Sequence, residues 1–139
     1  MKETVLVTGG AGYIGSHTAV ELIQAGFDVV IADNLSNSDL QAVEGVRRIT
    51  SAEVPFEQID CCDLQAMRRL FERHEFRSVI HFAASKAVGE SVAEPLKYYR
   101  NNLLSFLNVV ELMCEFGQHT ILFSSSCTVN GEPDAQPVT

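Results

Sequence analysis

The chain has 139 residues, of which 46% are hydrophobic and 20% are charged, a balance typical of one soluble globular domain. Its formal net charge of -8 argues against nucleic acid or an anionic membrane surface as the main partner, because either would require a basic stripe. Only three consecutive apolar residues, Val5 to Val7, lie between Thr4 and Thr8, too few for a signal peptide or a membrane span. We therefore expect a cytoplasmic protein.

Five short apolar runs alternate with helical patterns along the chain. They lack a clean polar and apolar alternation, as strands covered on both faces do. The expected strands span Thr4–Val7, Asp28–Ala32, Val54–Ile59, Ser78–Phe82 and Thr120–Phe123. Their order predicts a parallel sheet.

Two of the intervening segments have a clear apolar face at helical spacing. The first is followed by Gly26, and the second begins at Pro95 and ends at Gly117, which are ordinary start and stop signals. The apolar positions are Gly15, Ala19, Leu22 and Ile23 in the first helix, and Tyr99, Leu103, Leu107, Val110 and Cys114 in the second. Strand, helix and strand units joined by right-handed crossovers predict a doubly wound α/β domain of the Rossmann type over residues 1–139.

Cysteine and histidine residues give no metal-binding pattern. The chain has no C-x-x-C pair and no H-E-x-x-H motif, so we expect no metal site and buried free thiols. The four cysteines are Cys61, Cys62, Cys114 and Cys127.

A glycine-rich segment, Thr8-Gly9-Gly10-Ala11-Gly12-Tyr13-Ile14-Gly15, lies between the first strand and the first helix. Gly9 would allow a tight turn, Gly12 would leave room for phosphates, and Gly15 would let the helix approach the sheet. A pyrophosphate needs such backbone N–H donors at a helix N-terminus. An ordinary turn is the alternative, but the strand before and the helix after favour a dinucleotide site.

Asp33 closes the second strand 18 residues beyond Gly15, near the spacing of about 20 expected of an acid that binds a ribose. Its carboxylate would accept hydrogen bonds from a ribose 2'-hydroxyl and repel a 2'-phosphate. Positions 34–38 carry no positive charge, and Arg47 and Arg48 are the nearest basic residues downstream. The sequence therefore favours NAD over NADP, with a helix-capping aspartate as the alternative.

Later segments follow one another in a recognisable series. They are Asp33-Asn34-Leu35-Ser36-Asn37-Ser38, Lys86-Ala87-Val88-Gly89-Glu90-Ser91-Val92, Tyr98-Tyr99-Arg100-Asn101-Asn102 and Ser124-Ser125-Ser126-Cys127-Thr128-Val129. The series strongly resembles the UDP-glucose 4-epimerase family of extended short-chain dehydrogenase/reductases, from Val5 to about Gly131. The chain departs from that family at Ala84-Ser85, where Gly-Leu is usual, and at Asn130, where Tyr is usual.

The resemblance implies a role for each matching position around NAD. Tyr13 and Ile14 would present backbone N–H groups to the pyrophosphate. Lys86 would bind the nicotinamide-side ribose or the phosphates, and Asn101 would contact the nicotinamide side, although a surface lysine and a helix-face asparagine are alternatives. The other implied positions are Asn34, Asn37 and Ser38 beside Asp33 at the adenosine ribose, Asp60 and Cys61 at adenine, and Phe82, Ala83, Ala84 and Ser85 along the cofactor.

The resemblance also implies interconversion of UDP-glucose and UDP-galactose through a 4'-keto sugar, with NAD tightly bound. Ser126 would be catalytic and would touch the substrate, through a hydrogen bond to the reacting 4'-oxygen. The family's Tyr-x-x-x-Lys motif is not present, because Tyr13, Tyr98 and Tyr99 have no lysine four positions later. A homodimer is plausible from the same resemblance.

We expect the chain to stop before the sixth strand and the C-terminal substrate domain, and to be inactive by itself. Residues 130–137 have the composition of a loop. Two other functions remain open. One is another NAD-dependent nucleotide-sugar epimerase or dehydratase, and the other is a non-catalytic NAD-binding fragment.

Overall fold

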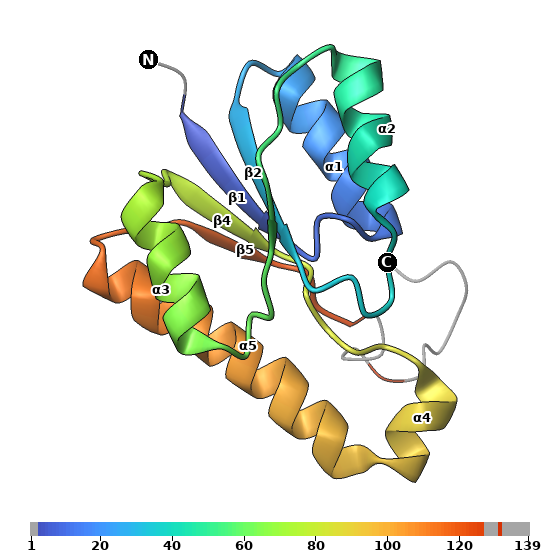
Figure 1. The fold of residues 1–139 in the computed structure, drawn as a ribbon. Coiled ribbons are helices and arrows are strands. Elements are labelled where there is room, and N and C mark those ends of the chain that lie inside the picture. The colour runs from blue at the N-terminus through green and yellow to red at the C-terminus, as the bar shows by residue number, and fades with distance from the viewer. Residues whose placement is uncertain (1–2, 127–130, 132–139) are drawn as a thin grey trace.

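The computed structural model describes residues 3–126 and 131. Within them lie five strands and five helices, with one helix between successive strands except for two between the last pair. Figure 1 shows their arrangement. In chain order they are β1 (Thr4–Thr8), α1 (Tyr13–Gln24), β2 (Asp28–Asp33), α2 (Leu40–Thr50), β3 (Phe56–Gln58), α3 (Leu64–Arg73), β4 (Ser78–His81), α4 (Val88–Ala93), α5 (Pro95–Glu115) and β5 (Ile121–Phe123). Each expected strand is present, and the largest difference in bounds is at β3, where the paired part is shorter than Val54–Ile59.

The strands form one parallel sheet in the order β3-β2-β1-β4-β5. The chain builds outward from β1 to β3 on one side, then crosses back to place β4 on the other side of β1. The connections from β1 and from β4 therefore run to opposite sides of the sheet. Ligands of such sheets bind outside the carboxyl ends of the strands at the point between these two strands. The doubly wound α/β prediction is confirmed.

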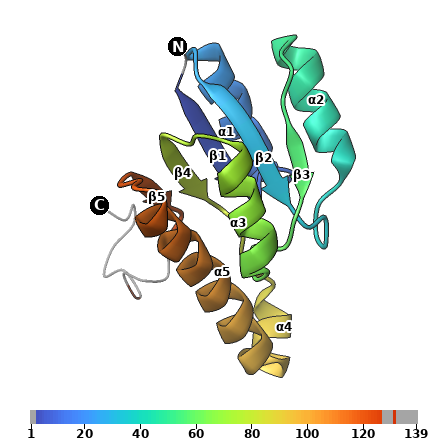
Figure 2. The same cartoon turned by 60° about the vertical axis from the view of Figure 1, so that its left-hand side comes forward.

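Two apolar cores lie on opposite faces of the sheet, and Figures 1 and 2 show the helices arranged accordingly. One face of the sheet packs against α1 and α2, and the other against α3 and α5. Alternate residues of β1 separate the two cores, because Val5 and Val7 point to the first and Leu6 to the second. Strands covered on both faces explain the absence of polar alternation in the sequence.

The face of α5 that packs on the sheet differs from the apolar stripe seen in its sequence. Tyr99, Leu103 and Leu107 are 66%, 56% and 58% exposed, so most of the stripe does not face the core. The buried face includes polar residues, and Asn108 donates a hydrogen bond to the Cys61 carbonyl at 2.9 Å. The buried residues of α5 are Tyr98, Ser105, Asn108, Val109, Leu112 and Met113. No helix in the described part of the chain is long and apolar enough to cross a membrane.

Helix N-termini differ in a way that matters for the site. Asp39 caps α2 by accepting from the Gln41 N–H at 2.8 Å, and Asp63 caps α3 by accepting from the Ala66 N–H at 3.0 Å. The corresponding residue of α1 is Gly12, which has no side chain to cap the helix. The first N–H groups of α1 therefore have no partner within the helix or from a capping side chain.

Candidate dinucleotide-binding site

The loop between β1 and α1 lies directly against the segment that follows β4. Gly9 has a φ of +68°, and a Cβ at this position would lie 2.7 Å from the Ala83 nitrogen and 2.8 Å from the Phe82 carbonyl carbon. Both neighbours are backbone atoms, which have little room to move away. Gly9 is therefore required for the turn and for the close approach.

Gly12 and Gly15 are glycines for different reasons. A Cβ on Gly12 would be in tight contact with the Gly9 carbonyl oxygen, at 3.2 Å, and beyond that one contact the space above this residue is open. A Cβ on Gly15 would lie 2.7 Å from the Gly10 Cα. The close approach at Gly15 thus brings α1 against the glycine loop, whereas we expected it to bring the helix against the sheet.

The first turn of α1 presents backbone donors at the carboxyl edge of the sheet. The N–H groups of Tyr13 and Ile14 belong to the set that α-helix geometry leaves without intrahelical acceptors. Their side chains are 78% and 50% exposed. This arrangement suits a role played by the backbone, and it provides the donors and the partial positive charge that a pyrophosphate needs.

Asp33 joins the glycine loop to the loop after β2. Its Oδ2 accepts from the Ala11 N–H at 3.1 Å, while Oδ1 accepts from the Leu35 N–H at 2.9 Å and the Ser38 hydroxyl at 2.7 Å. The residue is buried, and Leu35 has a φ of +59°, a strained conformation for a leucine. Since Asp39 caps α2, the helix-capping alternative for Asp33 is wrong.

Asn34 and Asp60 bring the ends of β2 and β3 together. The Asn34 Nδ2 donates to the Asp60 Oδ2 at 3.4 Å, and the Asp60 Oδ1 accepts from the Cys62 N–H at 2.8 Å. Asn34, Asp60 and Asn37 are exposed. These contacts place the residues implied for the adenosine half along one edge.

Cys61 does not present its side chain to this edge. It is buried in the core against α3 and α5, and burial, with the nearby Asp60 carboxylate, raises the pKa of its thiol to about 12. Only its backbone can face a ligand. The expectation of buried free thiols holds for Cys61, is wrong for the half-buried Cys62 and the exposed Cys114, and lies outside the described residues for Cys127.

The segment after β4 is fixed by α5. Ser85 pairs through both backbone groups with the side-chain amide of Asn102, with N–H to Oδ1 at 2.8 Å and Nδ2 to carbonyl oxygen at 2.9 Å. The Asn101 Nδ2 donates to the Ser85 Oγ at 3.1 Å. Phe82, Ala83 and Ser85 are half-buried, and Ala84 and Lys86 are exposed. Sequence reasoning identified Asn101 and missed Asn102, although the Asn pair was the available signal.

A buried histidine that sequence reasoning did not single out lies behind the glycine loop. The His81 Nδ1 is 2.8 Å from the Thr8 Oγ1, which joins the carboxyl ends of β4 and β1. The ring also stacks with Phe123, at 6.1 Å between centroids. Burial lowers the pKa of His81 to about 4, so the ring is neutral near pH 7.

Ser126 follows β5 at the same edge of the sheet. The Ser124 N–H donates to the His81 carbonyl at 3.3 Å, which continues the pairing of β5 with β4 past Phe123. Ser126 is exposed two residues further on. Asn130 lies outside the described residues.

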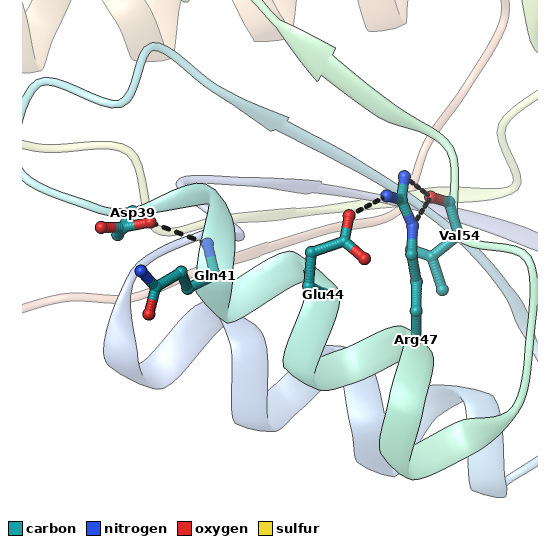
Figure 3. A network of polar contacts seen from close by, with 5 residues as sticks. All are labelled: Asp39, Gln41, Glu44, Arg47 and Val54. Carbon is teal, nitrogen blue, oxygen red and sulfur yellow. Dashed lines mark hydrogen bonds and ion pairs between the residues drawn. The ribbon is translucent and has the colours of Figure 1, made fainter.

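Arg47, the nearest arginine to Asp33 along the chain, is directed elsewhere. Figure 3 shows the Arg47 guanidinium against the loop before β3, where Nε and Nη2 donate to the Val54 carbonyl at 3.1 and 2.7 Å. Its Nη1 pairs with Glu44 at 2.5 Å. Val54 precedes the amino end of β3, whereas Asp33 ends β2 at the carboxyl edge. Arg47 is therefore committed at the far edge from the position where a 2'-phosphate would lie.

Potential metal ligands do not gather at this edge. Among residues 3–126 and 131, no group of three or more His, Cys, Asp or Glu side chains is arranged to hold a metal ion.

The glycine loop, the uncapped start of α1 and Asp33 together define a dinucleotide-binding α/β domain. A family model described as the NAD dependent epimerase/dehydratase family matches residues 5–139, and the chain belongs to that family. This agrees with the resemblance found in the sequence.

Known relatives are similar over nearly the whole chain. A UDP-glucose 4-epimerase of Neisseria gonorrhoeae is 54% identical over 98% of this chain and 40% of its own length. The crystal structure of the Bifidobacterium longum enzyme with NAD+ and UDP has a TM-score of 0.93 at 48% identity, covering 98% of this chain and 41% of that one. A Stenotrophomonas maltophila UDP-glucose-4-epimerase with NAD and formylated UDP-arabinopyranose has a TM-score of 0.92 at 47% identity, covering 98% and 40%. The chain thus spans about 40% of the length of the relatives it matches.

Proposed function

We propose that this chain is the NAD-binding part of an NAD-dependent UDP-glucose 4-epimerase. The observation that carries the proposal is the open glycine loop at the uncapped start of α1, beside Asp33, at the point where the sheet diverges. The similarity to UDP-glucose 4-epimerases at about half of all positions supports the same function.

The residues fit NAD at each part of the molecule. The open space at Gly12 and the N–H groups of Tyr13 and Ile14 suit the pyrophosphate. Asp33, supported by Asn34, Asn37 and Ser38, suits the adenosine ribose, with Asp60 and the Cys61 backbone near adenine. The remaining contacts come from Gly9 and Gly15 in the loop, and from Phe82, Ala83, Ala84, Ser85, Lys86 and Asn101 on the nicotinamide side.

Bound NAD would supply the chemistry by accepting hydride from C4 of the sugar and returning it to the other face. Ser126 would hydrogen-bond the reacting 4'-oxygen and hold it at the end of β5. The sequence offers no Tyr-x-x-x-Lys pair to take the 4'-hydroxyl proton. We therefore expect residues 1–139 alone to bind NAD and to turn over UDP-sugars negligibly.

The proposed substrate is a UDP-sugar, and UDP-glucose and UDP-galactose would place the protein in galactose metabolism. One similar structure holds formylated UDP-arabinopyranose, which keeps another UDP-sugar as a second candidate. The described cysteines are free thiols, which supports the reducing cytoplasm as the location.

A homodimer through α4 and α5 is part of the proposal. Both helices carry large apolar side chains in solvent, and such patches mark interaction surfaces. The exposed residues are Val88 and Val92 on α4, and Leu96, Tyr99, Leu103, Leu104 and Leu107 on α5.

The direct test is to denature the purified protein and identify the nucleotide it releases. We expect NAD, because the residues proposed to hold it lie within residues 1–139 and do not depend on turnover. Release of NADP or of a flavin would contradict the proposal. A separate assay with UDP-galactose should give no turnover by residues 1–139. Measurable turnover would contradict the expectation that these residues lack the group that takes the 4'-hydroxyl proton.

A further inference from the structure

The segment between β4 and α4 has no regular structure, and its path is set by contacts from two directions. At its start, the Ala83 backbone lies against Gly9, where a Cβ would be 2.7 Å from the Ala83 nitrogen. Two residues later, the Asn102 amide pairs with both the N–H and the carbonyl of Ser85. A side chain that satisfies both backbone groups of one residue fixes the orientation of that peptide segment more strictly than a single hydrogen bond does.

A second side chain of α5 fixes the far end of the segment. Tyr98 lies one helical turn before Asn102, and its hydroxyl accepts from the Ala87 N–H at 3.1 Å. The same hydroxyl donates to the Glu90 Oε2 at 2.7 Å, and Glu90 also pairs with Lys97. The backbone is therefore fixed on both sides of Lys86, while the Lys86 side chain itself is exposed.

We propose that Asn102 is a positioning residue: by pairing with the Ser85 backbone, it sets the direction in which Lys86 leaves the loop, toward the nicotinamide half of the dinucleotide. This inference rests on the proposed function and extends it to a residue that would not itself touch the cofactor. Asn102 is adjacent to Asn101, whose Nδ2 contacts both Ser85 Oγ and Asn102 Oδ1.

A second asparagine on the same helix provides a comparison. Asn108 donates from its side-chain amide to the Cys61 carbonyl at 2.9 Å, beside Asp60 in the loop after β3. Asn102 and Asn108 are thus similar in chemistry and in helix, but each holds the loop at a different half of the site. Loss of Asn108 should disturb the adenine side.

The experiment measures NAD and AMP affinities by calorimetry for the nucleotide-free chain and for Asn102→Ala and Asn108→Ala. AMP reports on the adenosine half alone. Asn102→Ala should weaken NAD binding by about 5-fold to 50-fold, from the loss of two hydrogen bonds, and should leave AMP binding within about twofold. Asn108→Ala should weaken both ligands. Equal weakening of NAD and AMP by Asn102→Ala, or no weakening of NAD, would overturn the proposal.

A double-mutant cycle with Lys86→Ala separates positioning from general loosening. If Asn102 acts through Lys86, the two substitutions together should weaken NAD binding little more than Lys86→Ala does alone. Full additivity would contradict the inference. Asn102→Asp, which keeps the acceptor for the Ser85 N–H, provides a milder variant if Asn102→Ala fails to fold. If the unaltered chain binds AMP but not NAD, or binds neither, the proposed function fails, and the inference fails with it.

Discussion

Gly12 is the residue whose substitution separates cofactor binding from folding most cleanly. Its φ of -73° is accessible to any residue, and a Cβ there meets only one protein atom, at 3.2 Å. The Gly9 carbonyl must shift by a few tenths of an ångström to accept the new methyl, so Gly12→Ala should lower the urea midpoint only slightly. The new methyl would occupy the phosphate space, so we expect NAD affinity to fall on the order of 100-fold, since a misfit at a close backbone contact also displaces the neighbouring donors.

Gly45 supplies the matched control for that substitution. It lies inside α2 with no atom within 4 Å of an added Cβ. Gly45→Ala should stabilise the protein by up to about 1 kcal/mol, as expected for a helix interior, without changing NAD affinity. Equal NAD affinity in Gly12→Ala and in the unaltered protein would mean that no phosphate lies above Gly12.

Asp33 is predicted to decide between NAD and NADP. Asp33→Asn should destabilise the fold by roughly 1–3 kcal/mol, because an amide donor would then face one of the N–H or O–H donors that the carboxylate accepts. It should also narrow the ratio of NAD to NADP affinity, measured by calorimetry. Ser38→Ala removes one of the three bonds to the carboxylate and keeps its charge, so it should change that ratio less than Asp33→Asn does. A ratio unaltered in Asp33→Asn would contradict the assignment.

His81 should make stability depend on pH. Burial lowers its pKa from 6.5 to about 4, so below about pH 6.5 the unfolded chain takes up a proton that the folded protein excludes. Stability is then lost as the pH falls toward about 4, by about 2 kcal/mol between pH 7.5 and pH 5. Urea unfolding at the two pH values should show this loss, and His81→Gln should reduce it. An equal loss in the variant would assign the effect to other groups.

At the scale of single residues, the sequence was informative where spacing is set by backbone geometry. The glycine positions and Asp33 follow from the turn and the strand end, and the structure places them together. Spacing does not identify Asn108 or His81, because each acts through a contact between elements distant in the sequence, such as Asn108 with Cys61. Asn102 was missed although it stands beside Asn101, and its pairing with Ser85 is visible only in the structure.

At the scale of elements, the apolar periodicity of α5 predicted the wrong face of this helix as the one that packs on the sheet. The apolar stripe through Tyr99, Leu103 and Leu107 lies in solvent. The helix instead packs through a mixed face in which Ser105 and Asn108 are buried beside Val109 and Leu112. From sequence alone, polar residues such as Asn108 are expected in solvent and apolar residues in the core, whereas Asn108 is buried through its bond to the Cys61 carbonyl and the apolar stripe is exposed.

That surface gives a prediction about assembly. If α5 pairs with a second copy, Leu103→Glu should weaken the dimer by on the order of 100-fold, because a carboxylate would be buried without a partner. Ile49→Glu, at a 63% exposed position on α2, should leave the dimer intact. Light scattering coupled to gel filtration gives the mass of each. A monomeric unaltered protein at tens of micromolar would contradict the proposed interface.

At the scale of the whole molecule, the parallel sheet was predictable because its strands are uniformly apolar and separated by helix-length segments. The bounds of β3 were harder to predict than the sheet itself. Pro55 and the Arg47 contact to the Val54 carbonyl modify the start of this edge strand. The order β3-β2-β1-β4-β5 brings the glycine loop, Asp33 and the Ser85–Lys86 segment to one edge. The site is therefore a property of the topology as much as of any motif.

The carboxyl edge of the sheet is proposed to bind NAD. The most direct measurement is calorimetric titration of the nucleotide-free protein with NAD and, separately, with NADP. We expect NAD to bind with a dissociation constant below about 10 micromolar and NADP to bind at least about tenfold more weakly, since the carboxylate of Asp33 repels a 2'-phosphate. Absence of NAD binding, or equal affinity for the two nucleotides, would contradict the account.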